Sequence, residues 1–242
     1  MKMKVKIRIT KSIIPNLLTL GNLFSGFTSI IYISKGEYEI AAIMILIAGV
    51  FDALDGVVAR LIRSTSLIGV ELDSLCDAVS FGVAPSFLLY NVYFYNLDEF
   101  GILFAALPAL AGVYRLARFN TQATMEDKNY FKGMPIPAAA LFIISFVIFY
   151  FNNNSFDVNY KVIGIYFVTL TASLSMITNV KFDNLPRPSW KAIQSHPWNF
   201  IVTLIGFIVS LVTAGYFLFP FMVFYVFVSY IRALYFLLKK KP

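Results

Sequence analysis

Long apolar windows recur along almost the whole of this chain. Each is about twenty residues long, which is the helical length needed to cross roughly 30 Å of hydrocarbon. They predict an all-α integral membrane protein, a bundle of about eight transmembrane helices. Seven is the alternative count, because only a short turn before Pro220 separates the last two windows. The windows are residues 12–33, 38–61, 67–95, 100–119, 134–151, 161–179, 199–216 and 218–238.

The composition supports this class. Of the 242 residues, 59% are hydrophobic and only 14% are charged, whereas soluble domains contain about 25% charged residues. A water-soluble core could not absorb so much Phe, Ile and Leu without leaving large apolar patches on the surface. The single cysteine, Cys76, excludes an intramolecular disulfide and forms no metal-binding pair.

The basic residues lie between the apolar windows and give a formal net charge of +7. This placement favours contact with anionic lipid headgroups and a role in topology, and it argues against nucleic acid as a partner. With eight spans and a cytoplasmic N-terminus, every Lys and Arg except Lys35 and Lys161 faces the cytoplasm. We therefore expect both termini inside and the protein in the cell membrane.

The expected domain organisation is simple. A basic juxtamembrane arm at residues 1–11 precedes a single transmembrane catalytic domain at 12–238, and a basic tail follows at 239–242. No small-residue cleavage site follows the arm, so the first window is expected to be a retained span.

Four aspartates lie in the second and third windows: Asp52, Asp55, Asp73 and Asp77. Ionised carboxylates at bilayer depth are costly and are kept mainly for function. The first pair is three residues apart and the second pair four, so each pair lies on one face of a helix. A short turn makes the two helices antiparallel, so the faces can meet near the cytoplasmic ends. Four carboxylates suit hard divalent cations, and they are enough to bridge two ions about 3.5–4 Å apart.

Small residues and an arginine accompany these aspartates. Gly56 and Gly69 remove side chains that would block a ligand, and Arg60 is placed to contact phosphate. Two other interpretations are structural ion pairs between aspartates and arginines, and a pathway for cations. Neither explains why Gly56, Ala59, Arg60 and Gly69 stand at these spacings.

The pattern D-x2-D-G-x2-A-R-x8-G-x3-D-x3-D, from Asp52 to Asp77, resembles the signature of the CDP-alcohol phosphotransferases at every position. The resemblance implies a helical membrane enzyme, often a homodimer, in which a hydroxyl attacks the β-phosphorus of a CDP-linked donor and CMP leaves. It implies that all four aspartates hold two divalent cations, Mg²⁺ or Mn²⁺, and that Asp77 is also the general base. Gly56, Ala59, Arg60 and Gly69 would receive the cytidine diphosphate.

Four further segments resemble the phosphatidylserine synthase branch of that family. They are Ile14 to Asn22, Asp77 to Pro85, Tyr114 to Asn120 and Phe131 to Pro137. The resemblance extends over roughly residues 12–140, and it implies L-serine as the acceptor.

A bound serine requires a hydrogen-bond donor for its carboxylate and a hydrogen-bond acceptor for its ammonium group. Arg115 and Arg118 lie three apart on one helix face and are candidates for the carboxylate; the alternative is that both are positively charged residues at a helix end. Asn120, Ser80 and Asn22 are further candidates, and each also fits a helix cap or a contact between helices.

The predicted function is therefore transfer of a phosphatidyl or archaetidyl group from a CDP-linked lipid to serine, at the cytoplasmic face. One alternative keeps this chemistry with glycerol phosphate or inositol phosphate as acceptor. The other is a cation transporter that uses the aspartates. The apolar spans do not distinguish acyl-ester from isoprenoid-ether tails.

Overall fold

The computed structural model describes residues 12–62, 66–122, 130–153, 155–183, 205–206, 208–210 and 212–239. Helices dominate these residues, and two three-residue strands accompany them. The elements are α1 (Ile13–Ser34), α2 (Tyr38–Leu61), α3 (Leu67–Asp77), η1 (Ala78–Val83), α4 (Ala84–Val92), η2 (Phe94–Leu97), α5 (Asp98–Gln122), β1 (Tyr130–Lys132), α6 (Ile136–Phe146), η3 (Val147–Phe151), α7 (Val158–Ile177), β2 (Lys181–Asp183) and α10 (Leu218–Lys239).

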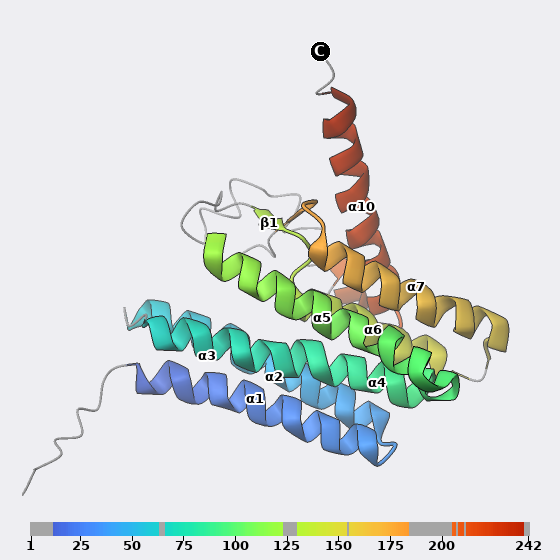
Figure 1. The fold of residues 1–242 in the computed structure, drawn as a ribbon, viewed down its shortest axis with the longest axis horizontal. Coiled ribbons are helices and arrows are strands. Elements are labelled where there is room, and N and C mark those ends of the chain that lie inside the picture. Colours follow the sequence, from blue (N-terminus) through green and yellow to red (C-terminus); the bar gives the residue numbers. More distant parts are fainter. Residues whose placement is uncertain are drawn as a thin grey trace, which may run out of the picture.

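Helices α1 and α2 form an antiparallel hairpin, and α3 and α4 continue alongside them (Figure 1). The hairpin turns at Gly36, whose φ of 77° is the left-handed conformation that glycine adopts without strain. The Glu37 N–H donates to the Tyr32 carbonyl at 3.0 Å, which closes a Schellman motif at the end of α1. The tight turn therefore lets α2 fold back against α1, with which it packs.

The third span is one continuous helical run with a π-helical segment in its middle. Ser66 caps the N-terminus of α3: its Oγ accepts the Gly69 N–H at 3.0 Å. Six residues, Ala78–Val83, then form the π-helical segment η1 directly after Asp77, and α4 follows. Single π turns inside α-helices often mark functional sites.

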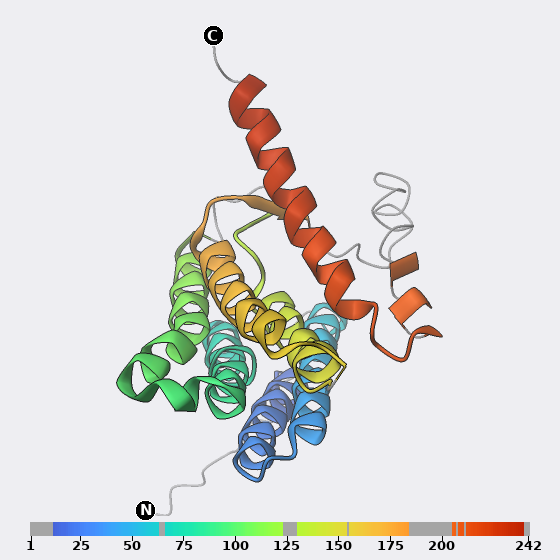
Figure 2. The same ribbon diagram turned by 90° about the vertical axis from the view of Figure 1, so that its right-hand side faces the viewer.

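The remaining helices form the second half of the molecule. Helix α5 packs against α7 and against η1, and α6 lies between these elements. Strands β1 and β2 pair antiparallel, with Phe131 opposite Phe182, and link the segment after α5 to the end of α7. Helix α10 packs against α6 and β2 and projects beyond the other helices (Figure 2).

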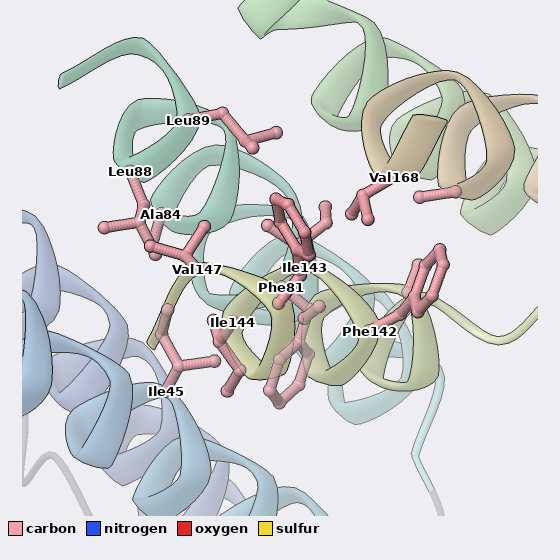
Figure 3. Close-up of a cluster of buried hydrophobic side chains, with 14 of the residues drawn as sticks. Ile45, Phe81, Ala84, Leu88, Leu89, Phe142, Ile143, Ile144, Val147 and Val168 are labelled. Carbon is pink, nitrogen blue, oxygen red and sulfur yellow. The ribbon is translucent and has the colours of Figure 1, made fainter. Parts of the chain in front are cut away.

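The buried core lies where the two halves meet. Helix α6 supplies its centre, since nearly every residue from Ala139 to Val147 is buried. Its partners come from α2, the third span and α7, as the close-up in Figure 3 shows. The labelled side chains are Ile45, Phe81, Ala84, Leu88, Leu89, Phe142, Ile143, Ile144, Val147 and Val168.

The structure confirms the expected all-α membrane class. Six described helices are long and apolar enough to cross a membrane: Ile13–Ser34, Tyr38–Leu61, Ile68–Val92, Phe94–Thr121, Val158–Ile177 and Leu218–Lys239. The window at 134–151 forms a shorter apolar helix, Ile136–Phe151. Most of the window at 199–216, the basic arm at 1–11 and residues 240–242 lie outside the described residues. The count of eight, the orientation and the domain boundaries stay predictions.

Gly26 allows a close approach between α1 and the third span. A Cβ at this position would overlap the Ser80 Oγ and stand 2.7 Å from the Ser80 Cα. Gly26→Ala should therefore push α1 away from η1 and destabilise the protein by about 1–3 kcal/mol, the usual penalty of overpacking. The melting temperature in detergent measures this change.

Gly49→Ala is the matched control, because a Cβ there has its nearest neighbour, the Phe81 ring, at 3.9 Å. This variant should melt at or above the wild-type temperature, since alanine also has the higher helix propensity. Equal melting temperatures for the two variants would contradict the close packing of α1 on η1.

Candidate active site

The carboxylates of α2 and α3 converge where the C-terminal part of α2 lies close to α3. Carboxylate oxygens of Asp52, Asp55 and Asp73 all lie within 4.8 Å of one another. We call these three the carboxylate cluster. Asp77 lies one turn beyond Asp73, at the last residue of α3, and only 7% of its surface is exposed.

Helix α1 supplies hydrogen bonds to this region. The Thr19 hydroxyl donates to Asp55 Oδ2 at 2.6 Å, and the Asn22 amide donates to Asp77 Oδ1 at 2.9 Å. Thr19 and Asn22 are three residues apart, so both face α2 and α3 from one side of α1. The Ser80 hydroxyl in turn donates to the Asn22 backbone carbonyl at 3.0 Å.

Thr19 was not among the residues singled out by the sequence analysis. The available signal was its spacing from Asn22, which places two polar side chains on one face of an otherwise apolar helix. Its hydroxyl could equally have bonded only to its own helix, and it does lie 3.0 Å from the Pro15 carbonyl. Only the tertiary fold brings this hydroxyl against Asp55, to which it donates.

The carboxylate cluster fits a divalent metal ion by its chemistry. All of its ligand atoms are hard carboxylate oxygens, which suit Mg²⁺, Mn²⁺ or Ca²⁺. In addition, Asp73 Oδ1 is buried and has no hydrogen-bond partner among the described residues. A buried oxygen without a donor is unfavourable unless a ligand or ion satisfies it. The site can therefore hold a metal ion.

The four small and basic positions of the signature line the neighbouring parts of α2 and α3. Arg60 is exposed, and one of its terminal nitrogens lies 3.4 Å from the place that a Cβ of Gly56 would occupy. A Cβ at Gly69 would stand 3.0 Å from Ser66 Oγ and 3.3 Å from Asn16 Oδ1. Gly56, Gly69 and Ala59 are partly buried. A side chain at Gly56 would therefore extend toward Arg60, and one at Gly69 would press on Ser66 and Asn16.

The remaining candidate residues lie on α5, across from α3. Arg115 is buried, and its guanidinium carbon lies 5.9 Å and 5.7 Å from the ring centres of Phe119 and Phe131. Asn120 exchanges hydrogen bonds with Ser74, at 3.0 Å from its amide nitrogen, in the turn of α3 that carries the aspartates. Asn120 thereby connects α5 to the helix of Asp73 and Asp77.

Arg118 has a different environment from Arg115. Its Nη1 donates to the Ile177 carbonyl at 2.7 Å, and its Nη2 donates to the Lys132 carbonyl at 2.9 Å. Further contacts of these nitrogens reach Met176 O, Thr178 O and Asn179 Oδ1. The guanidinium therefore joins α5 to the C-terminus of α7 and to β1, where a positive charge also complements the helix dipole. Gly133, with a φ of 79°, makes room for it.

A helical membrane bundle with clustered aspartates on its second and third spans fits one family of membrane enzymes. The chain belongs to the CDP-alcohol phosphatidyltransferase family, whose model matches residues 12–178. Three relatives carry more specific names. The CDP-diacylglycerol–serine O-phosphatidyltransferase of Helicobacter pylori is 36% identical over 176 residues, which are 73% of this chain and 74% of the relative.

The CDP-diacylglycerol–serine O-phosphatidyltransferase of Bacillus subtilis is 34% identical over 188 residues, covering 77% of this chain and 98% of the relative. The archaetidylserine synthase of Methanothermobacter thermautotrophicus is 37% identical over 174 residues, covering 71% and 70%. These similarities extend over most of both chains. The family match at residues 12–178 includes the carboxylate cluster and the helices around it.

Arg118→Ala should lower stability, because it leaves the carbonyls of α7 and β1 without their charged donor. Hydrogen bonds to a charged group contribute about 1.5–3 kcal/mol each, so the melting temperature in detergent should fall clearly. Arg118→Lys should recover only a small part, since an ammonium cannot reproduce the planar fork. Arg60→Ala is the control for stability, because Arg60 is exposed. A wild-type melting temperature for Arg118→Ala would contradict the structural role.

Proposed function

We propose that this chain transfers the phosphatidyl or archaetidyl group of a CDP-linked lipid to the hydroxyl of L-serine and releases CMP. The observation that carries the proposal is the convergence of the aspartates on α2 and α3 within the region that the family model matches. The acceptor is supported by relatives over 30% identical that are named for serine. Those names differ in the lipid, so the donor of this proposal carries either acyl-ester or isoprenoid-ether tails.

In this proposal the four aspartates Asp52, Asp55, Asp73 and Asp77 hold two divalent cations, Mg²⁺ or Mn²⁺. When bound, these ions supply polarisation of the donor diphosphate and offset the charge on departing CMP. The buried Asp73 Oδ1, for which the described residues offer no hydrogen-bond donor, supports this assignment. The hydrogen bonds from Thr19 and Asn22 hold two of the carboxylates in fixed orientations, as is usual for metal ligands.

Asp77 acts as the general base. The serine hydroxyl attacks the phosphorus next to the lipid, its proton passes to an Asp77 oxygen, and the bond between that phosphorus and the CMP oxygen breaks. A serine hydroxyl is a weak nucleophile at neutral pH, so a positioned base contributes roughly 10²–10⁴-fold. The Asn22 amide occupies Asp77 Oδ1, which leaves Oδ2 to face the substrate.

The donor headgroup lies along the signature positions of α2 and α3. Gly56, Ala59 and Gly69 leave space for the cytidine diphosphate, and Arg60 contacts its phosphates. The exposed position of Arg60 beside Gly56 supports this arrangement. The lipid tails remain in the bilayer beside the helices.

The serine carboxylate is assigned to Arg115, with Asn120, Ser80, Asn22 and Arg118 as further residues of the acceptor pocket. Burial of Arg115 supports it as the direct contact, because a buried guanidinium binds a carboxylate strongly. The terminal nitrogens of Arg118 already bond to α7 and β1, so its contribution is to position α5.

Three further assignments complete the proposal. The active site faces the cytoplasm, as the distribution of Lys and Arg predicts. The basic N-terminal arm and C-terminal tail contact anionic lipid headgroups. The functional unit is a homodimer, as the family resemblance implies.

The purified protein should release CMP from a CDP-linked lipid when serine and Mg²⁺ or Mn²⁺ are both present. A chelator should abolish this release, and added metal should restore it, because the cluster requires cations to act. Glycerol phosphate and inositol phosphate, offered separately, should give little CMP. A preference for glycerol phosphate or inositol phosphate would show that this compound, and not serine, is the acceptor. Cation flux without CMP release would indicate a transporter.

Asp77→Asn keeps size and hydrogen bonding but removes the base. The turnover number should fall by about 10²-fold or more, while the melting temperature stays close to that of the wild type. Glu71→Gln is the matched control: it removes an exposed carboxylate from the same helix and should retain activity. If Asp77→Asn kept more than about a tenth of the wild-type rate, Asp77 would not be the base.

A further inference from the structure

One oxygen of the site has no hydrogen-bond partner among the described residues, and the proposed mechanism does not use it. Asn22 is completely buried, and its Oδ1 has no hydrogen-bond partner among the described residues. The other polar atoms of this residue are engaged: the side-chain nitrogen donates to Asp77, and the backbone carbonyl accepts from Ser80. A buried amide oxygen left unsatisfied is destabilising. This unsatisfied oxygen therefore indicates the position of a ligand group.

The orientation of this amide is fixed by its neighbour. Asp77 presents a carboxylate oxygen, which accepts but does not donate when ionised, so the nitrogen of Asn22 must face it. The oxygen is then the free end of the side chain. Because nitrogen and oxygen share one carbon, this oxygen lies beside the Asp77 carboxylate. Helix α1 and η1 hold the residue in place, since Gly26 lets Ser80 approach it.

An amide oxygen next to a carboxylate selects a particular kind of ligand group. Both are hydrogen-bond acceptors, so the group between them must donate and is favoured if it carries positive charge. An ammonium group meets both conditions. A phosphate would instead present its own negatively charged oxygens to these acceptors.

We propose that Asn22 Oδ1 binds the ammonium group of the amino-alcohol acceptor and makes the site selective for it. This inference rests on the proposed function and extends it to a residue that distinguishes serine from the phosphate-bearing acceptors. In serine the hydroxyl and the ammonium stand on adjacent carbons. A serine whose hydroxyl faces Asp77 can therefore bring its ammonium to the neighbouring Asn22 oxygen. The same side chain then orients the base and recognises the nucleophile that the base activates.

The test compares serine with 3-hydroxypropanoate, which has the same hydroxyl and carboxylate but no ammonium. The KM for serine and the inhibition constant of 3-hydroxypropanoate against serine are measured by CMP release, for the wild type and for Asn22→Leu. Leucine is similar in size to asparagine but can neither accept nor donate. The KM for serine should rise about tenfold or more, while the inhibition constant changes less than about threefold.

Thr19→Val is the matched control. It removes one hydrogen bond from α1 to a carboxylate of the same site, but it does not alter the group that faces the ammonium. It should change both constants by a similar factor. If Asn22→Leu turns over too slowly for kinetics, saturation-transfer NMR with CMP and Mg²⁺ compares the binding of serine with that of 3-hydroxypropanoate directly.

The outcomes separate this inference from the proposed function. If the wild type releases no CMP with serine, the proposed function fails, and the inference fails with it. If the wild type is active and Asn22→Leu weakens serine and 3-hydroxypropanoate equally, only the inference is overturned, and Asn22 serves solely to position Asp77. A selective loss of serine binding supports the inference.

Discussion

Placing several carboxylates close together inside an apolar helix bundle is unfavourable unless hydrogen bonds or cations offset their charge. The arrangement around α2 and α3 meets this constraint. Helix α1 donates one hydrogen bond to Asp55 and another to Asp77. Asp73 Oδ1 has no donor in the part of the chain that the structure describes, so it is suited to a cation. Helix α1 is thus part of the site, although it carries none of the aspartates.

The third span shows how backbone geometry serves this arrangement. The π-helical segment η1 begins directly after Asp77 and brings Ser80 against Asn22. Gly26 removes the side chain that would prevent this contact. Small residues of this kind let membrane helices approach closely. The orientation of Asn22, and through it the orientation of Asp77, therefore depends on packing one turn away from the carboxylates.

The two arginines of α5 show that equal spacing does not mean equal roles. Arg118 donates to the ends of α7 and β1, so it stabilises the second half of the molecule. Arg115 lies one turn earlier, buried beside Phe119 and Phe131. The tertiary fold therefore places the two guanidinium groups, one turn apart, in different surroundings.

The sequence by itself determined the helical membrane class and the family, because long apolar windows require spanning helices and the spacing from Asp52 to Asp77 is highly specific. Helical periodicity also predicted that Asp52, Asp55, Asp73 and Asp77 face one another, and the structure places carboxylate oxygens of the first three within 4.8 Å of one another. The sequence did not determine that Thr19 binds Asp55, that Asn22 binds Asp77 with its oxygen left over, or that Arg118 joins α5 to α7. These contacts link residues 36, 55 and 59 positions apart. Only the packing of distant helices, which local periodicity does not encode, decided them.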